Sequence, residues 1–296
     1  MIDKSAGISA LVEEHVKDGD TIFVGGFGHC VPFALGFEII RQGKKDLTLC
    51  RSGTDILFDI LIGAGVTSKV VFGYLGNPGI GLGHAFRRAV EEGTLAYEEW
   101  TNMAMILRLE AARQGVPFLP SRILQLGDIA GASVDVRTVN CPYTGEKLAC
   151  IPALEPDVAL VHAQQADKAG NIQMIGVDGD TVTGAMASVK ILVTVERFVE
   201  TAEIEKMPEV TRIPGYRTTG VAELAWGAHP SYVEGAYGRD DDHFRAYDSE
   251  ARMEKGLADY IRRYVYNCAD HAAYTEMVGK KRLAELRAQS SGRKIV

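Results

Sequence analysis

The sequence predicts an α/β fold in which an open, mostly parallel sheet is flanked by helices and carries one hairpin insertion. Three times in succession, a run of β-forming residues leads through a turn rich in Gly, Ser or Asn into a helical pattern. Repeated strand–turn–helix units are typical of parallel strands joined by right-handed crossovers. No linker or change of composition divides the 296 residues, so we expect a single domain over 1–296.

The first half of the chain contains the three strand–turn–helix units, and apolar periodicity with flanking glycines sets their bounds. Helices are expected over residues 8–16, 33–42, 56–62, 84–92 and 101–113. Strands are expected over residues 22–24, 47–50 and 69–75. The turns after these strands would line one crevice, because the carboxyl ends of neighbouring parallel strands meet at one edge of the sheet.

The second half departs from this regular alternation. Residues 134–139 and 147–151 flank a turn at 141–146 and predict a hairpin insertion over about 134–152. The other expected elements are core strands at 158–162 and 191–195, a short helix at 185–190, an irregular region at 200–245 and two amphipathic helices over about 249–288.

Composition and charge exclude several classes of protein. The formal net charge of −7 argues against nucleic acid or an anionic membrane as the main partner. No apolar run approaches the ~20 residues of a membrane helix, and the N-terminus does not resemble a signal peptide, so the expected location is the cytoplasm. Five scattered cysteines without a C-x-x-C pair predict neither a disulfide framework nor a zinc site, and no metal is expected.

The first strand ends in Gly25, Gly26 and Gly28, and this turn is the main candidate for a functional site. Glycine lets amide groups approach a ligand closely. The third glycine of a dinucleotide fingerprint is missing, which argues against NAD binding, and no Gly-Lys-Ser/Thr follows any glycine turn to form a P-loop. The other interpretations are a tight turn with no further role, or an oxyanion hole for acyl transfer.

A series of motifs begins with Val24-Gly25-Gly26-Phe27 and the following Pro32. This series resembles the A (α) subunit of family I coenzyme A transferases, of the glutaconate CoA-transferase type. Further matches occur in the same order along nearly the whole chain, at residues 37–43, 46–48, 115–120, 145–147, 157–159, 162–166 and 227–231. The Ser-Glu-Asn-Gly signature of the B subunit is absent, which fits the role of the α chain.

This resemblance implies an enzyme that works with a B subunit in a heterotetramer and moves CoA between carboxylic acids. The family reaction runs through a glutamyl-CoA thioester on the B subunit, so the coenzyme A thioester is a substrate and no permanently bound cofactor is expected. By the same resemblance, the amides of Gly26 and Phe27 belong to the oxyanion hole. The strand-end turns supply the candidate substrate-binding residues: Gly25, Ser52, Gly53, Thr54, Asn77 and Gly79.

Two departures from the family pattern stand out. The spacing from Phe27 to Pro32 is one residue shorter than in relatives. Asn77 is followed by Pro78, where the glutaconate type has a serine, and this puts a dicarboxylate substrate such as glutaconate in doubt.

A weaker similarity leads to an alternative function. Residues 72–74, 152–154 and 237–240 are similar to the α chain of an actinobacterial steroid-degradation enzyme, a CoA-thioester hydrolase that opens a carbon–carbon bond. That similarity implies Glu99 as a catalytic base, whereas Glu98 and Glu99 could equally form a solvated acidic pair before a helix. A third hypothesis is a non-catalytic ligand-binding domain of the same architecture.

Other reactive side chains are interpreted as structural. His29 and Cys30 are adjacent in sequence, and adjacent side chains seldom face each other, which argues against a Cys–His nucleophile. His162, at the end of a predicted strand, is expected to be a hydrogen-bonded core histidine. His229 and the acidic run 240–243 lack zinc-like spacing, and the run is expected to be a solvated loop.

Overall fold

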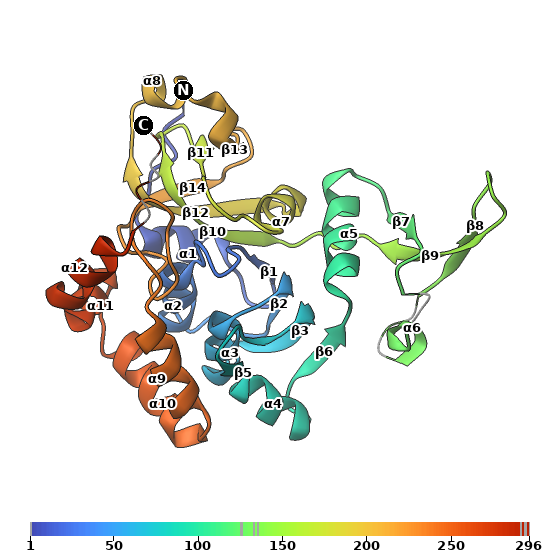
Figure 1. The fold of residues 1–296 in the computed structure, drawn as a ribbon, viewed down its shortest axis with the longest axis horizontal. Coiled ribbons are helices and arrows are strands. Elements are labelled where there is room, and N and C mark those ends of the chain that lie inside the picture. Colours follow the sequence, from blue (N-terminus) through green and yellow to red (C-terminus); the bar gives the residue numbers. More distant parts are fainter. Residues whose placement is uncertain are drawn as a thin grey trace.

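A nine-stranded sheet runs through the described part of the chain (Figure 1). The computed structural model describes residues 2–124, 127–132, 134, 136–290, 292 and 295. In spatial order, the parallel strands are β14 (Gly220–Glu223), β12 (Lys190–Phe198), β10 (Val158–Ala166), β1 (Thr21–Val24), β2 (Leu47–Gly53), β3 (Thr67–Tyr74) and β6 (Ala96–Glu99). Two short strands, β11 (Ile172–Gln173) and β13 (Thr211–Ile213), extend the sheet antiparallel from β10. The predicted open, mostly parallel sheet is confirmed.

Helices cover both faces of this sheet, and each face has its own hydrophobic core. Because side chains alternate along a strand, Ile22 and Phe23 of β1 enter opposite cores. The core around Ile22 contains residues of α1 (Ile8–His15), α2 (Phe33–Arg41), α3 (Ile56–Gly63), α4 (His84–Glu91), α9 (Asp241–Ala251) and α10 (Glu254–Ile261). The core around Phe23 contains residues of α5 (Asn102–Arg113) and α7 (Thr181–Ala187).

A small antiparallel sheet projects beyond α5, away from the main sheet (Figure 1). The predicted hairpin is present as β8 (Thr138–Asn140) and β9 (Lys147–Pro152), although residue 135 of its predicted first arm lies outside the described residues. The insertion is larger than predicted, because β7 (Phe118–Ser121) pairs with the other edge of β9 and α6 (Ile129–Ala132) follows β7.

The C-terminal region contains more helices than the two predicted over 249–288. A π-helical turn, Arg262–Tyr266, follows α10, and α11 (His271–Val278) and α12 (Lys280–Ala288) complete the region. The apolar periodicity continues through the breaks, which arise from single residues: Met253 is extended, Asp270 caps α11 through the Ala273 amide, and Gly279 has a φ of +91°.

Several strands differ from the sequence-based prediction, and β6 and β10 are two of them. β6 has no fully buried residue, so the alternation that signals a strand is missing, and the segment was expected to precede a helix without pairing. β10 continues beyond His162 to Ala166 and is buried throughout, because Gln164 and Gln165 are hydrogen-bonded to Ile175 O and Gln173 Oε1.

The region 200–245 also contains regular elements where none were expected. They include β13, β14, α8 (Thr201–Ile204), the 3-10 turn Pro208–Val210 and the start of α9. In the described part of the chain, no helix has the length and apolar character needed to cross a membrane.

Candidate active site

The carboxyl ends of β1 and β10 lie next to each other, at the point where the strand order of the sheet reverses. From β1 the chain continues through α2 to β2, whereas from β10 it continues through α7 to β12, in the opposite direction. Since α2 and α7 pack in different cores, these two connections diverge over opposite faces of the sheet. Open α/β sheets bind ligands at such a switch point, and the glycine turn (residues 25–28) follows β1 at this point.

Glycine is required at the first two positions of the glycine turn. The Gly25 N–H donates to Leu160 O of β10 at 2.8 Å, and a Cβ on Gly25 would lie 2.9 Å from Thr181 Cγ2. Gly26 has a φ of +84°, and its Cβ would lie 2.5 Å from the Val31 nitrogen. The turn is therefore fitted against β10 and the first residue of α7.

The amides of Gly26 and Phe27, predicted from the sequence to form the oxyanion hole, both have acceptors within the chain. The Gly26 N–H donates to Thr181 Oγ1 at 2.8 Å, and the Phe27 N–H donates to His29 O at 3.0 Å. Gly26 is buried, whereas Phe27 is 48% exposed. In this structure, neither amide can donate to a substrate oxygen without a change in the turn.

A buried ion pair between Arg51 and Asp180 lies beside the glycine turn. Arg51 Nη2 is 3.2 Å from Asp180 Oδ1, and the two residues are 1% and 2% exposed. Arg51 Nη1 donates to Gly25 O at 2.9 Å, and the Ser52 N–H donates to Asp180 Oδ2 at 3.0 Å. Sequence reasoning missed both charged residues, since Arg51 lies inside β2 and Asp180 is 129 residues away.

The other predicted substrate-binding residues follow β2 and β3. Ser52 and Gly53 end β2 and do not form a separate turn, and the Thr54 N–H donates to Tyr74 O at 2.9 Å. Asn77 lies in the short strand β4 (Gly76–Asn77), which pairs with β5 (Gly81–Leu82), and its Nδ2 donates to Phe244 O at 3.3 Å. Within the described residues, Thr54 Oγ1 and Asn77 Oδ1 are buried without a hydrogen-bond partner. Gly79 is exposed, with a φ of +76°.

Glu99 is the last residue of β6 and is exposed to solvent. Its register partner is Phe72 of β3, which pairs with Arg51 of β2, so two strand spacings, about 10 Å, separate Glu99 from β2. The neighbouring Glu98 is half-buried and accepts hydrogen bonds from Lys69, Trp100 and Arg108. Burial alone would raise the pKa of the Glu98 carboxyl, but these three partners outweigh burial and lower it.

The family model described as Coenzyme A transferase matches residues 6–224, a segment that includes every predicted site residue. The chain belongs to this coenzyme A transferase family. The resemblance that the sequence motifs indicated is confirmed.

The chain is similar in sequence to named relatives and in fold to a solved structure. The chain is 36% identical over 272 residues to the A chain of the 3-oxoadipate CoA-transferase of Pseudomonas knackmussii, covering 91% of this chain and 96% of that protein. It is 33% identical over 285 residues to the cholesterol ring-cleaving hydrolase IpdA subunit of Rhodococcus jostii, covering 90% and 94%. The glutaconate coenzyme A-transferase structure from Acidaminococcus fermentans superimposes with a TM-score of 0.91 at 29% identity, covering 96% of this chain and 95% of that one.

In this coenzyme A transferase chain, His29 and Cys30 do contact each other, against the sequence-based expectation. The left-handed φ of Cys30, 54°, brings its Sγ to 3.3 Å from His29 Nε2. Burial raises the pKa of the Cys30 thiol well above its usual value, and burial lowers the pKa of His29. A buried neutral thiol is a poor nucleophile, so the contact is structural.

The same residues attach the 229–237 segment to the glycine turn. His29 Nδ1 lies 2.9 Å from Val177 O, and the Glu234 N–H donates to His29 Nε2 at 3.0 Å. The Cys30 N–H donates to Tyr232 O at 2.9 Å. These bonds hold two distant segments against the turn that follows β1.

The buried histidines outside the turn belong to hydrogen-bond networks. His162 contacts Thr194 Oγ1 and Glu196 Oε1, each at 2.9 Å, as expected for a core histidine. His229, Asp240 and His243 bring three ligand-type atoms within 4.8 Å of one another. However, Arg282 Nη2 donates to Asp240 at 2.6 Å, and a guanidinium at this distance opposes a metal cation.

Asp240 corrects the prediction that 240–243 is a solvated loop. The residue is 3% exposed, and its side chain caps α9 by accepting the His243 N–H at 3.0 Å. Burial alone would raise the pKa of its carboxyl, but hydrogen bonds from His229 and Arg282 hold the pKa well below its usual range.

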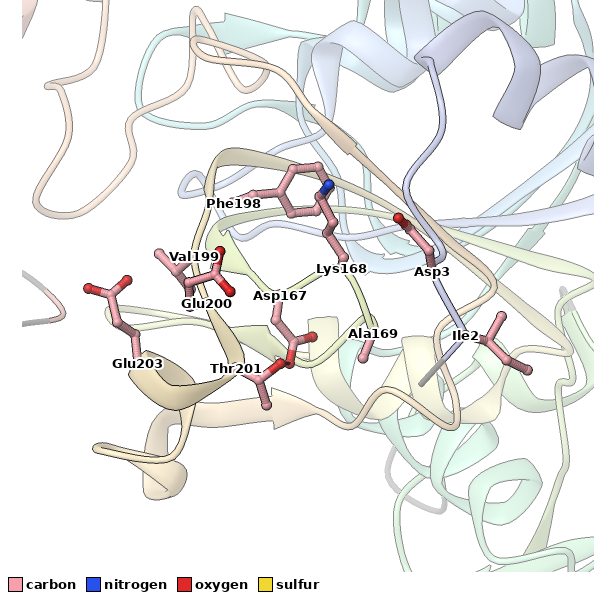
Figure 2. Close-up of a pocket in the computed structure, with 10 residues that line it drawn as sticks. All are labelled: Ile2, Asp3, Asp167, Lys168, Ala169, Phe198, Val199, Glu200, Thr201 and Glu203. Atoms are coloured by element: carbon pink, nitrogen blue, oxygen red, sulfur yellow. Dashed lines mark hydrogen bonds between the residues drawn. The ribbon is translucent and has the colours of Figure 1, made fainter.

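The hollow in Figure 2 lies away from the glycine turn, and none of the predicted site residues lines it. It has a volume of about 380 Å³ and is formed by the chain start and the segments that follow β10 and β12. Its carboxylate Asp167 already accepts hydrogen bonds from Asn171 and Thr201. The predicted substrate crevice is therefore not this hollow.

Proposed function

We propose that this chain is the α chain of a hetero-oligomeric CoA-transferase that moves CoA between carboxylic acids together with a B subunit. The observation that carries the proposal is the close-packed glycine turn at the switch point of a coenzyme A transferase sheet. The 36% identity to a protein named as the A chain of a CoA-transferase supports the role of this chain as one half of such an enzyme.

In the proposed reaction, a glutamate carboxylate supplied by the B subunit performs the first attack, on the carbonyl carbon of the acyl-CoA thioester. The carbonyl electron pair moves to oxygen, and collapse of this oxyanion expels the CoA thiolate and leaves an acyl-glutamyl anhydride. The thiolate then attacks the glutamyl carbonyl, which gives the glutamyl-CoA thioester and releases the first carboxylic acid. The acceptor acid reverses these steps, so CoA enters as a substrate.

The role of this chain is to bind the acyl group and stabilise the oxyanion. Gly26 and Phe27 are the donors that the family resemblance suggests, and Gly25, Ser52 and Gly53 lie beside them at the ends of β1 and β2. Among the described residues, Thr54 Oγ1 and Asn77 Oδ1 have no hydrogen-bond partner, and Gly79 is exposed. These groups at the neighbouring strand ends support a substrate pocket there.

Arg239 affects which acyl substrates we expect this chain to bind. It donates to the carbonyl oxygen of Pro78 at 3.4 Å, at the position where the sequence lacks the expected serine hydroxyl. Nη1 of this guanidinium pairs with Asp241 Oδ1 at 3.2 Å, so a substrate carboxylate that Arg239 binds in place of the missing hydroxyl would share the guanidinium with Asp241. Dicarboxylic acids, for which the 3-oxoadipate relative is named, are therefore the first substrates to test.

Trapping of the thioester intermediate tests the proposal. The chain is purified with the B subunit encoded beside it, incubated with a dicarboxylic acyl-CoA and treated with borohydride, which reduces a glutamyl thioester. Peptide mass spectrometry should then find one reduced glutamate, on the B subunit. A reduced glutamate on this chain would contradict the assignment of roles, and omission of acyl-CoA is the control.

The alternative function is a CoA-thioester hydrolase that opens a carbon–carbon bond with Glu99 as base. The 33% identity to the ring-cleaving hydrolase subunit supports this alternative function. A base needs a buried carboxyl, and Glu99 is exposed in this chain, so only a partner subunit could bury it. Glu99→Gln should therefore leave the transferase rate within about two-fold of the wild type, and a larger loss would favour the hydrolase-type role.

A non-catalytic ligand-binding domain is the third hypothesis from the sequence. It predicts a chain that is stable alone and binds a ligand without a partner. Strict co-purification with the B subunit would oppose this hypothesis.

A further inference from the structure

Within the described part of the chain, one amide of the glycine turn has no hydrogen-bond acceptor. The Gly26 and Phe27 N–H groups donate to Thr181 Oγ1 and His29 O. Among the residues that the structure describes, none accepts a hydrogen bond from the Gly28 N–H. The Gly28 N–H is therefore the amide of the turn that is available to a substrate oxygen.

Gly28 also has the exposure that a donor to substrate needs. Gly28 is exposed, whereas Gly26 is buried. A Cβ built on Gly28 would meet no atom within 4 Å, so the space above this residue is open. On the side of Gly28 where a side chain would lie, no atom of the surrounding residues blocks a bound molecule.

Two hydroxyl groups fix the backbone of the turn, one at the Gly25–Gly26 peptide and one at the Gly28–His29 peptide directly after this amide. Thr181 Oγ1 holds the Gly26 N–H at 2.8 Å, and Ser231 Oγ donates to Gly28 O at 2.6 Å. Both residues are fully buried, and they come from α7 and from the segment that follows β14. Donors held in place before the reaction are those that stabilise an oxyanion best, because they need no reorganisation when charge develops.

We propose that the Gly28 amide is the oxyanion donor of this chain, with Thr181 and Ser231 as its positioning residues. This inference rests on the proposed acyl transfer and replaces Gly26 and Phe27 as the donors to substrate. Those two amides then have a structural task, which is to hold the turn in the shape that presents Gly28.

Backbone ester substitution tests the donor directly, because it removes one N–H and keeps the side chain. Glycolic acid at position 28 or phenyllactic acid at position 27 is introduced by nonsense suppression, and each variant chain is assembled with the B subunit. The ester at 28 should lower kcat by about 100-fold or more, the usual cost of losing an oxyanion donor, with little change in KM. The ester at 27 should lower kcat by less than about ten-fold, since a neutral structural hydrogen bond contributes modestly.

The positioning residues have matched side-chain variants. Thr181→Val removes the acceptor at constant shape and should lower kcat by about ten-fold or more, because misplaced catalytic groups react slowly. Thr181→Ser should restore kcat, which a purely steric role would not explain. Thr183→Val, on the same helix, is the control and should match the wild type.

The outcomes separate this inference from the proposed function. If wild-type enzyme forms the B-subunit thioester but the ester at 28 keeps kcat within five-fold, the Gly28 assignment is wrong and the transferase assignment stands. Equal losses from the esters at 27 and 28 would also overturn it. If the wild type forms no thioester, the proposed function itself fails. Circular dichroism and co-elution with the B subunit establish that each variant is folded.

Discussion

Arg51 and Asp180 are charged residues in a buried position, where an ion loses its favourable interaction with water. Moving two ions out of water costs several kcal/mol each, and their mutual attraction compensates only when the remaining hydrogen-bonding groups are also satisfied. Here they are, because Arg51 also donates to Gly25 O and Asp180 also accepts the Ser52 N–H. The pair thus joins the ends of β1 and β2 to the start of α7, and we interpret it as a device that fixes the turn.

Removal of one partner from this pair should destabilise the chain strongly. Arg51→Met leaves Asp180 as an unpaired buried charge, so the free energy of unfolding should fall by about 3–5 kcal/mol. Urea denaturation monitored by circular dichroism measures the change. The double variant Arg51→Met/Asp180→Leu should recover much of the loss, because no lone charge then remains buried.

The control for this prediction is an exposed ion pair. Arg113 pairs with Glu110 at 2.6 Å on the surface of α5, and Arg113→Met should cost less than about 1 kcal/mol. Equal destabilisation by Arg51→Met and Arg113→Met would show that the buried pair has no special structural role.

At the residue scale, the sequence predicts the turn of the candidate site but not which of its amides is available. Three glycines after a strand indicate a turn, and the structure has this turn. Which amide of the turn is available depends on Thr181 and Ser231, which lie 155 and 203 residues from the atoms they hold. Local sequence patterns report backbone conformation, but they contain no information on partners so distant in the chain.

Among the elements, the prediction succeeded for β1, α2 and α3, whereas β14 was missed although three of its four residues are buried. β1, α2 and α3 have apolar residues at the period of their secondary structure, and their observed bounds agree with the predicted ones within one residue. β6 was missed because its partly exposed side chains give no periodic signal, although its backbone pairs with β3. The side-chain pattern of β6 therefore does not reveal that its backbone is paired.

In the C-terminal helices, a buried histidine makes the folding stability of the chain depend on pH. His271, at the start of α11, is 8% exposed, and its Nε2 lies 2.8 Å from Ala225 O. Burial lowers its pKa to about 4, so the folded chain keeps this ring neutral where the unfolded chain, with an ordinary pKa of about 6.5, takes up a proton. Stability is therefore lost as pH falls from about 6.5 to about 4, since the unfolded state binds more protons there.

Replacement of His271 should reduce this pH dependence. In His271→Phe, the slope of unfolding free energy against pH between 4.5 and 6 should fall by about one proton, or about 1.4 kcal/mol per pH unit. At pH 7.5, where the wild-type ring is neutral in both states, the variant should be only about 1 kcal/mol less stable through loss of the Ala225 hydrogen bond. Denaturation curves across this range provide the test, and an unchanged slope would exclude His271 as the source.

At the scale of the whole molecule, the active site that we propose lies at the carboxyl edge of the sheet. Large apolar side chains remain exposed at this edge: Phe27 is 48%, Tyr74 44% and Val177 52% exposed. Phe27 follows β1, Tyr74 ends β3, and Val177 lies beside His29, whose Nδ1 is 2.9 Å from Val177 O. In the proposed reaction the attacking carboxylate comes from the B subunit, so the B subunit must cover this same edge.

A charge placed on this edge should therefore weaken assembly with the B subunit. Val177→Asp puts a carboxylate where apolar surface is to be buried, and burial of an unpaired charge is costly, so affinity for the B subunit should fall at least about ten-fold. Val189→Asp is a matched control, because Val189 is 57% exposed but precedes β12 at the opposite, amino edge of the sheet. Titration calorimetry with the isolated B subunit compares the two variants. Equal affinities would place the interface elsewhere, and loss of affinity only in Val189→Asp would place it at the amino edge, away from the glycine turn.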